Sequence, residues 1–123
     1  MGKWLWPAKG GVIHTFSDTY GGNKGIDITG KAGESVKATA AGKVVYLGTG
    51  LRGYGLLIIV KHNAEYLSAY AHNSKALVKE GSNVKAGQVI AQMGASDAAG
   101  PMLHFEIRKA GKPVDPLKLL PPR

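Results

Sequence analysis

The spacing of glycine and proline is the feature that most constrains the fold. Eighteen glycines and six prolines divide the chain into short apolar stretches, which leaves little room for helices and is typical of a β-rich domain with many tight turns. Residues 62–65 predict a hairpin, and residues 109–112 predict the turn into a short return that ends at residues 115–116. We therefore expect antiparallel pairing among five predicted strands rich in β-branched or aromatic residues, at 42–48, 55–62, 66–72, 87–93 and 103–108.

A repeated pattern indicates that the chain contains two similar β units. Residues 33–38 and 81–86 share the pattern GxxVKA, and each copy is followed by a glycine, a strand and another glycine. Two copies are too few for a solenoid, but they fit a folded-over β-sandwich to which each unit supplies strands. Biotinyl and lipoyl carrier domains show the same echo around a modified lysine in a Met-Lys-Met or Asp-Lys-Ala setting, and this sequence has neither.

Length and composition predict a single domain and exclude several classes of protein. A chain of 123 residues can build one hydrophobic core, and none of its apolar runs approaches the roughly 20 residues of a membrane-spanning helix. The absence of cysteine excludes disulfides and thiolate metal sites. The formal charge of +8 favours an acidic partner, yet the lysines are scattered, so nucleic acid is not expected. Residues 1–5 contain no signal core or lipidation cysteine and are interpreted as linker in a longer, monomeric protein.

Three stretches place polar side chains where they could line a cleft. Asp27 follows the glycine-rich residues 21–25 at the edge of a short strand. Alternation along residues 103–106 sends His104 and Glu106 away from the apolar face, and His72 ends a strand on the face predicted to hold Tyr70 and Ser68. The full set of candidate acid–base or metal-binding groups is His14, His62, His72, His104, Asp18, Asp27, Asp97, Asp115, Glu34, Glu65, Glu80 and Glu106.

From about Trp6 onward, the sequence resembles the LytM-type, or lysostaphin-type, peptidoglycan endopeptidase domain. That resemblance implies a mainly β fold, an antiparallel sandwich of the duplicated hybrid motif type with little helix. In the family, an HxGxD loop supplies two zinc ligands, a YxH strand end supplies a catalytic histidine, and an HxHFE-like strand supplies another catalytic histidine and the third ligand. The corresponding stretches here are Asn23-Lys24-Gly25-Ile26-Asp27, Tyr70-Ala71-His72 and Met102-Leu103-His104-Phe105-Glu106.

Two of these positions depart from the family pattern. Asn23 stands at the first ligand and Met102 at a catalytic histidine, which leaves Asp27 and His104 as only two of the three protein ligands that catalytic zinc requires. Recruitment of His72 as a third ligand would consume the remaining proton-handling histidine, and a thioether has no proton to transfer. We therefore expect no metal, no cofactor and no peptidase activity.

Catalytically degenerate LytM domains of one group of envelope lipoproteins share these features, including asparagine at the first ligand position. Membership would imply a periplasmic protein, anchored to the outer membrane, that activates an N-acetylmuramoyl-L-alanine amidase on peptidoglycan during daughter-cell separation. The expected partner-binding groove consists of Lys24, Arg52, Tyr54, Tyr70, His72, His104 and Arg108. Two alternatives stay open: a peptidoglycan-binding module without an activator role, and a zinc endopeptidase with altered ligands.

Overall fold

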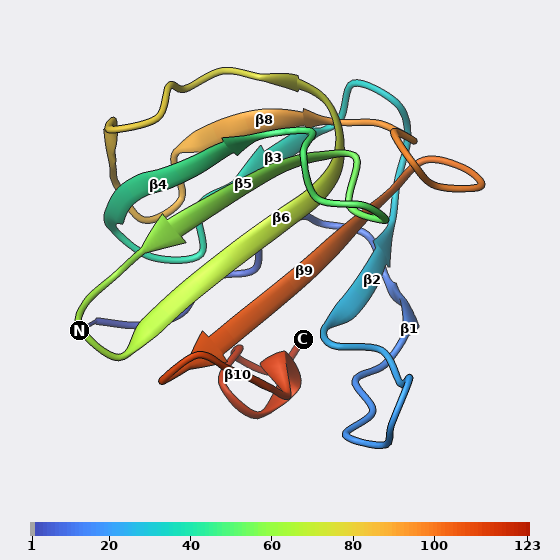
Figure 1. Ribbon diagram of the computed structural model, residues 1–123, viewed down its shortest axis with the longest axis horizontal. Helices are drawn as coiled ribbons and strands as arrows, with labels where there is room; N and C mark the ends of the chain where they lie inside the picture. Colours follow the sequence, from blue (N-terminus) through green and yellow to red (C-terminus); the bar gives the residue numbers. More distant parts are fainter. Residues whose placement is uncertain (1) are drawn as a thin grey trace.

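The computed structural model describes residues 2–123, and within them the fold is almost entirely β-structure (Figure 1). All strand pairings are antiparallel, which confirms the predicted class. The elements are β1 (Val12–His14), β2 (Ile26–Thr29), β3 (Ser35–Lys37), β4 (Gly42–Gly48), β5 (Leu56–Lys61), β6 (Tyr66–Ala76), β7 (Asn83–Val84), β8 (Val89–Met93), β9 (Met102–Lys109), β10 (Lys112–Val114) and the 3-10 helix η1 (Pro116–Lys118). None of the helical structure in this part of the chain is long and apolar enough to cross a membrane.

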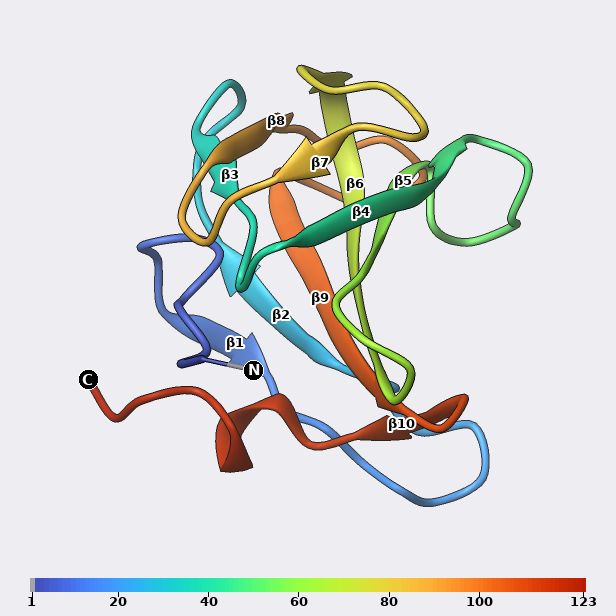
Figure 2. The ribbon, with the colours of Figure 1, turned by 90° about the vertical axis from the view of Figure 1, so that its left-hand side faces the viewer.

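The strands form one sheet that folds over itself. Its main path runs β1-β2-β9-β6-β5-β4-β7, with β10 paired to β9 and with β8 joining β6 to β3. Figure 1 shows the long strands β5, β6 and β9 side by side, and Figure 2 shows β3, β7 and β8 grouped near the upper ends of β6 and β9. The hairpin predicted at residues 62–65 joins β5 to β6, closed by a hydrogen bond from His62 N–H to Tyr66 O of 3.0 Å.

The two copies of the repeat are interlocked. Strand β3 of the first copy pairs with β8, which follows the second copy, while β7 of the second copy pairs with β4, which follows the first. Each copy begins at a glycine with positive φ, 88° at Gly33 and 90° at Gly81, a conformation that glycine adopts at little cost. The reciprocal pairing explains why both copies keep the same pattern, since each completes the sheet edge of the other.

Strand β6 changes partner at His72. Residues 66–71 pair with β9, whereas residues 73–76 pair with β8. At the corner His72 has a φ of 70°, which is unusual for a residue with a side chain. This φ interrupts the alternation along the strand, so His72 does not share the face of Tyr70 as the sequence predicted.

The core lies on the inner side of the folded sheet. Tyr70 and Phe105, neighbours across β6 and β9, are completely buried there with ring centroids 5.5 Å apart. On the outer side, Ala69, Ala71 and Leu57 form a small cluster with Tyr54 packed against it. Small side chains at this place leave room above the sheet, and the polar groups of the candidate site border that space.

Candidate functional site

Asp27 and His104 are brought together by strand register. They are direct partners across β2 and β9, and the glycine-rich loop permits this close pairing. A Cβ on Gly25 would lie 2.1 Å from the backbone oxygen of Phe105, which is a steric clash. Glycine avoids this clash because it has no Cβ. The sequence therefore fixes the approach of β2 to β9 through Gly25 and places the Asp27 carboxylate opposite the imidazole.

Both ring nitrogens of His104 face carboxylates. Nδ1 lies 2.7 Å from Oδ1 of Asp27, and Nε2 lies 2.7 Å from Oε2 of Glu106. Ionised carboxylates only accept hydrogen bonds, so both nitrogens must carry protons. Burial disfavours the charged imidazole, but the two carboxylates outweigh that effect and raise the pKa of His104 to about 9. At neutral pH this residue is an imidazolium that donates in both directions.

Glu106 links the imidazolium to two further side chains. Arg108 donates to Oε1 from Nε at 2.8 Å, and the Tyr54 hydroxyl donates to Oε2 at 2.9 Å. Only 1% of the Glu106 side chain is exposed. Burial opposes its ionisation, yet hydrogen bonds from His104 and Arg108 outweigh that penalty and lower the pKa of Glu106. The carboxylate is therefore a buried anion held between two cations.

His14 is a member of the site that the sequence analysis did not single out. It is the register partner of Asp27 on the other side of β2, and its Nδ1 donates to Oδ2 of Asp27 at 2.9 Å. Burial raises the pKa of Asp27, but the hydrogen bonds from His104 and His14 reverse this and leave it lowered. A three-residue strand with no motif around His14 offered no signal of this contact.

Three other motif positions are Asn23, His72 and Met102, of which the first two lie beside this network. The side-chain amide of Asn23 is 3.5 Å from Oδ2 of Asp27, at the limit of a hydrogen bond. His72 is 8% exposed, with its Nδ1 bound to the backbone oxygen of Ser96 at 2.8 Å and its ring centroid 6.1 Å from that of His104. Met102 precedes His104 by two residues and pairs with Thr29.

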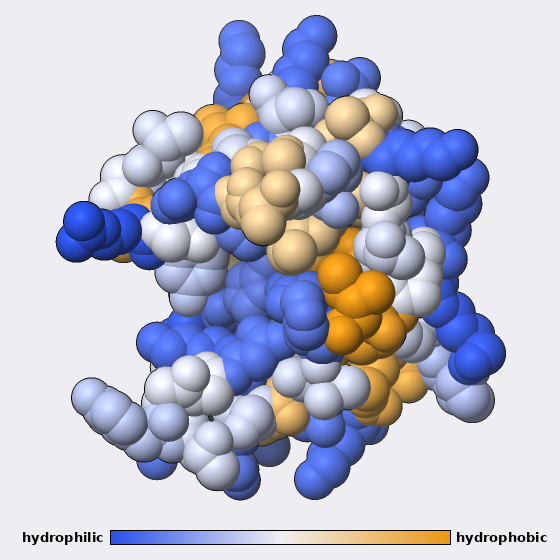
Figure 3. All heavy atoms as spheres, turned by 90° about the vertical axis from the view of Figure 1, so that its right-hand side faces the viewer, coloured by the Kyte–Doolittle hydropathy of each residue, from blue (hydrophilic) through white to orange (hydrophobic). Residues whose placement is uncertain are grey.

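Asn23, Asp27, His72, His104 and Glu106 line a polar hollow of about 270 Å³. Figure 3 shows the face of the molecule where hydrophilic side chains form a hollow beside an apolar patch. The predicted groove residues that line the polar hollow are Lys24, Arg52, Tyr54, His72 and His104. Arg108 lies in the adjoining apolar hollow of about 340 Å³, which shares Tyr54 and Glu106 with the first and has Leu51, Leu57, Ile59 and Leu67 in its walls.

Tyr70 does not belong to this groove. Its side chain is fully buried, and its hydroxyl accepts a hydrogen bond from the backbone N–H of Thr39 at 2.9 Å and contacts Ser68 Oγ at 2.7 Å. The prediction was wrong because strand alternation puts Tyr70 on the face of Phe105, and Ala71 on the face of His104.

The residues at the site do not fit a catalytic zinc ion. Zinc requires an unprotonated imidazole nitrogen, and each nitrogen of His104 donates to a carboxylate. Asn23 offers a neutral amide, which is a poor ligand for this ion. Within residues 2–123, no group of three or more histidine, aspartate or glutamate side chains is arranged to hold a metal ion.

Comparison with known proteins was consistent with this architecture. The profile of Peptidase family M23 matches residues 21–116. Similar curated proteins include Outer membrane antigenic lipoprotein B of Haemophilus influenzae, 60% identical over 96% of this chain and 29% of the relative, and Murein hydrolase activator NlpD of Escherichia coli, 59% identical over 100% of this chain and 32% of the relative. The chain thus spans about a third of the length of these relatives.

Solved structures extend the similarity to peptidases. A zinc-containing peptidase from Vibrio cholerae superposes with a TM-score of 0.88 at 31% identity, covering 98% of this chain and 41% of that one. The catalytic domain of lysostaphin from Staphylococcus simulans superposes with a TM-score of 0.78 at 31% identity, covering 90% of each chain. The fold predicted from the sequence motifs is confirmed.

Proposed function

This chain belongs to peptidase family M23, and from that premise we propose that it is a non-catalytic member that activates a periplasmic N-acetylmuramoyl-L-alanine amidase. The single observation that carries this proposal is that the ionisable side chains at the former metal site form ion pairs with one another. His104 donates to Asp27 and to Glu106, so the two ligand groups that remain satisfy each other. With Asn23 and Met102 at the other positions, the site lacks the third zinc ligand and one of the two catalytic histidines of the family pattern.

The names of the relatives support the activator role. A protein called a murein hydrolase activator is 59% identical across the whole of this chain, and other relatives are named as lipoproteins. By analogy we place this domain at the carboxy-terminal end of a longer lipoprotein, in the periplasm and anchored to the outer membrane. Its working partners would be the amidase and the peptidoglycan that the amidase cuts.

The groove offers the two kinds of contact that a protein partner needs. Lys24 and Arg52 give its polar part a positive rim, while Leu51, Leu57 and Ile59 give the adjoining part an apolar wall. Aromatic and arginine side chains are frequent interface anchors, and Tyr54 stands between the two parts. Activation requires that the groove bind the open form of the amidase more tightly than the closed form.

The test is hydrolysis of dye-labelled peptidoglycan by the amidase with and without this protein. We expect release only from the mixture and none from the protein alone. Lys24→Glu combined with Arg52→Glu should abolish the stimulation, while Lys43→Glu combined with Lys79→Glu serves as the matched charge-reversal control, because these two exposed lysines line neither hollow. Equal stimulation by both variants would show that the groove is not the docking site. Arg108 is left intact because its ion pair with Glu106 supports the site.

Two further measurements separate the alternatives. Stoichiometric zinc in the purified protein, together with cleavage of peptidoglycan by the protein alone, would establish a zinc endopeptidase with altered ligands. Co-sedimentation with insoluble peptidoglycan but no effect on any amidase would establish a wall-binding module. Zinc binding and hydrolysis are both disfavoured, because Asn23 stands at the first ligand position and both ring nitrogens of His104 are bound to carboxylates.

A further inference from the structure

The loop between β4 and β5, which carries Arg52 and Tyr54, is held by a segment far along the chain. The backbone N–H of Gly53 donates to Oδ2 of Asp97 at 2.7 Å, across 44 residues of sequence. Asp97 lies in the connection between β8 and β9. Within the loop, the hydrogen bond from Tyr54 N–H to Leu51 O is longer, at 3.3 Å. The contact with Asp97 therefore fixes the backbone directly after Arg52.

Ser96, the residue before Asp97, binds two further segments around the groove. Its hydroxyl accepts a hydrogen bond from Leu56 N–H at 3.1 Å and donates to the backbone oxygen of Asn73 at 2.7 Å. Its carbonyl oxygen accepts from Nδ1 of His72 at 2.8 Å, which orients a ring that lines the polar hollow. This short segment thus joins the loop, the start of β5 and the corner of β6.

The backbone of both partners is adapted to this contact. Gly55 has a φ of 62°, and a Cβ there would lie 2.3 Å from the carbonyl oxygen of Ser96, so glycine is needed for the close approach. Asp97 has a φ of 53°, a conformation that aspartate and asparagine adopt more readily than most residues with side chains. Asp97 is exposed, so its hydrogen bond to Gly53, rather than burial, gives this side chain a role.

The loop presents a cation that has no ionic partner in the described chain. Arg52 lines the polar hollow, and it forms no ion pair with any residue between 2 and 123. Asp97 is not among the lining residues of that hollow, and its carboxylate binds the loop backbone instead of the guanidinium. The arrangement holds the loop in place and leaves Arg52 available to a partner.

We infer that Asp97 is a positioning residue for the docking of the amidase. It holds the loop in the conformation in which Arg52 and Tyr54 meet the partner, and it acts through the backbone of Gly53. The inference rests on the proposed activator function and adds to it a residue outside the groove. A loop without this bond would adopt the docking conformation only part of the time, and the apparent affinity for the partner would fall by that fraction. The rate at saturation would not change, because the docked groove is the same.

The test is a titration of amidase-catalysed dye release against the concentration of this protein. Asp97→Gly tolerates the positive φ but removes the acceptor. It should raise the half-stimulating concentration about fivefold, the effect of one lost hydrogen bond, with the maximal rate unchanged. Asp97→Asn keeps an acceptor oxygen and tolerates the same φ, so it should behave like the unmodified protein. NMR relaxation of the backbone amides of Arg52 and Gly53 should show a more mobile loop in Asp97→Gly alone.

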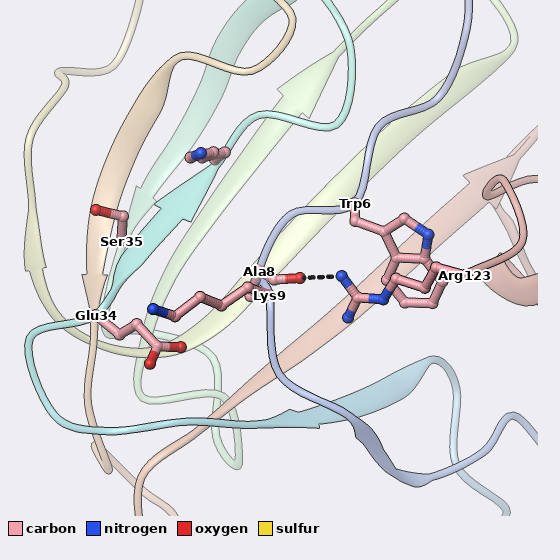
Figure 4. Close-up of a pocket in the computed structure, with 7 residues that line it drawn as sticks. Trp6, Ala8, Lys9, Glu34, Ser35 and Arg123 are labelled. Carbon is pink, nitrogen blue, oxygen red and sulfur yellow. Dashed lines mark hydrogen bonds between the residues drawn. The ribbon is translucent and has the colours of Figure 1, made fainter.

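Asp115→Gly is the matched control, because it removes the same kind of bond elsewhere. Oδ1 of Asp115 accepts from Leu117 N–H at 3.0 Å on the surface, and Asp115 lines neither hollow of the groove. The end of the chain beyond it has its own contacts, because the Arg123 guanidinium stacks 3.8 Å from the Trp6 ring centroid and donates to Ala8 O at 3.0 Å (Figure 4). Both glycine variants should lower the urea midpoint slightly, and only Asp97→Gly should change the titration.

Three results would overturn the inference. They are an unchanged half-stimulating concentration for Asp97→Gly, a lower maximal rate at an unchanged half-stimulating concentration, and unchanged relaxation of Arg52 and Gly53. If the unmodified protein stimulates no amidase, the proposed function falls, and the relaxation data alone decide whether Asp97 positions the loop.

Discussion

The carboxylate of Glu106 lies 2.7 Å from Nε2 of His104, two residues earlier on the same face of β9. A cation at His104 and a second at Arg108 share this one buried anion. The arrangement makes this part of β9 a row of charged side chains that neutralise one another. The stability of the site should therefore depend on Glu106 more than on any exposed charge.

We expect Glu106→Ala to lower the free energy of unfolding by about 3 kcal/mol or more, since removing one partner leaves buried charges unpaired. Urea denaturation followed by circular dichroism measures the change. The control is Glu65→Ala, whose partner Lys109 is 4.0 Å away on the exposed surface and whose loss should cost less than about 1 kcal/mol. Similar losses for the two variants would mean that the network contributes little.

The stability of the protein should fall at alkaline pH. The pKa of His104 in the folded state is about 9, above its value of about 6.5 in an unfolded chain. The contribution of protonated His104 to the free energy of unfolding is therefore complete below about pH 6.5 and is lost as the pH rises through 9. We expect a decrease of up to about 3 kcal/mol across that window. Chemical denaturation at a series of pH values should show this decrease in the free energy of unfolding, and His104→Gln should abolish the pH dependence. If the variant keeps the same pH dependence, a group other than His104 is responsible for it.

Tyr70→Phe should lower the stability of the core without changing the function of the groove. Loss of the hydroxyl leaves the buried N–H of Thr39 without its acceptor, at a cost of about 1–3 kcal/mol. Amidase stimulation by the folded variant should nevertheless equal that of the unmodified protein, because Tyr70 is not in the groove. Thermal unfolding and the dye-release assay check the two parts, and a selective loss of stimulation would return Tyr70 to the docking surface.

Gly25→Ala should disrupt the register that pairs Asp27 with His104. The added methyl group would meet the backbone oxygen of Phe105 at 2.1 Å, so β2 and β9 must separate, at a cost of about 2 kcal/mol or more. Gly100→Ala, where a Cβ meets no atom within 4 Å, is the matched control. Urea midpoints measure the difference, and equal midpoints would show that the loop moves freely.

Much of the fold followed from local patterns in the sequence. Strand β4 has the bounds that were predicted, 42–48, and the hairpin at 62–65 is confirmed, because turn residues and β-branched runs act within a few positions of the chain. Alternation also placed Leu103 and Phe105 in the core and His104 outside it. The resemblance to the LytM-type domain then assigned Asn23, Asp27 and His104 to one site.

By itself, the sequence determined the positions of β4, β5, β6, β8 and β9, the repeat, and the two departures from the family pattern, Asn23 and Met102, that argue against a working metal site. Only the tertiary structure decided which side chains surround the remaining groups. The positive φ of His72 and the register that joins His14 to Asp27 arise from contacts between distant segments, which local periodicity does not encode. For the same reason, the pairing of His104 with Asp27 and Glu106 became visible only once β2, β6 and β9 lay side by side.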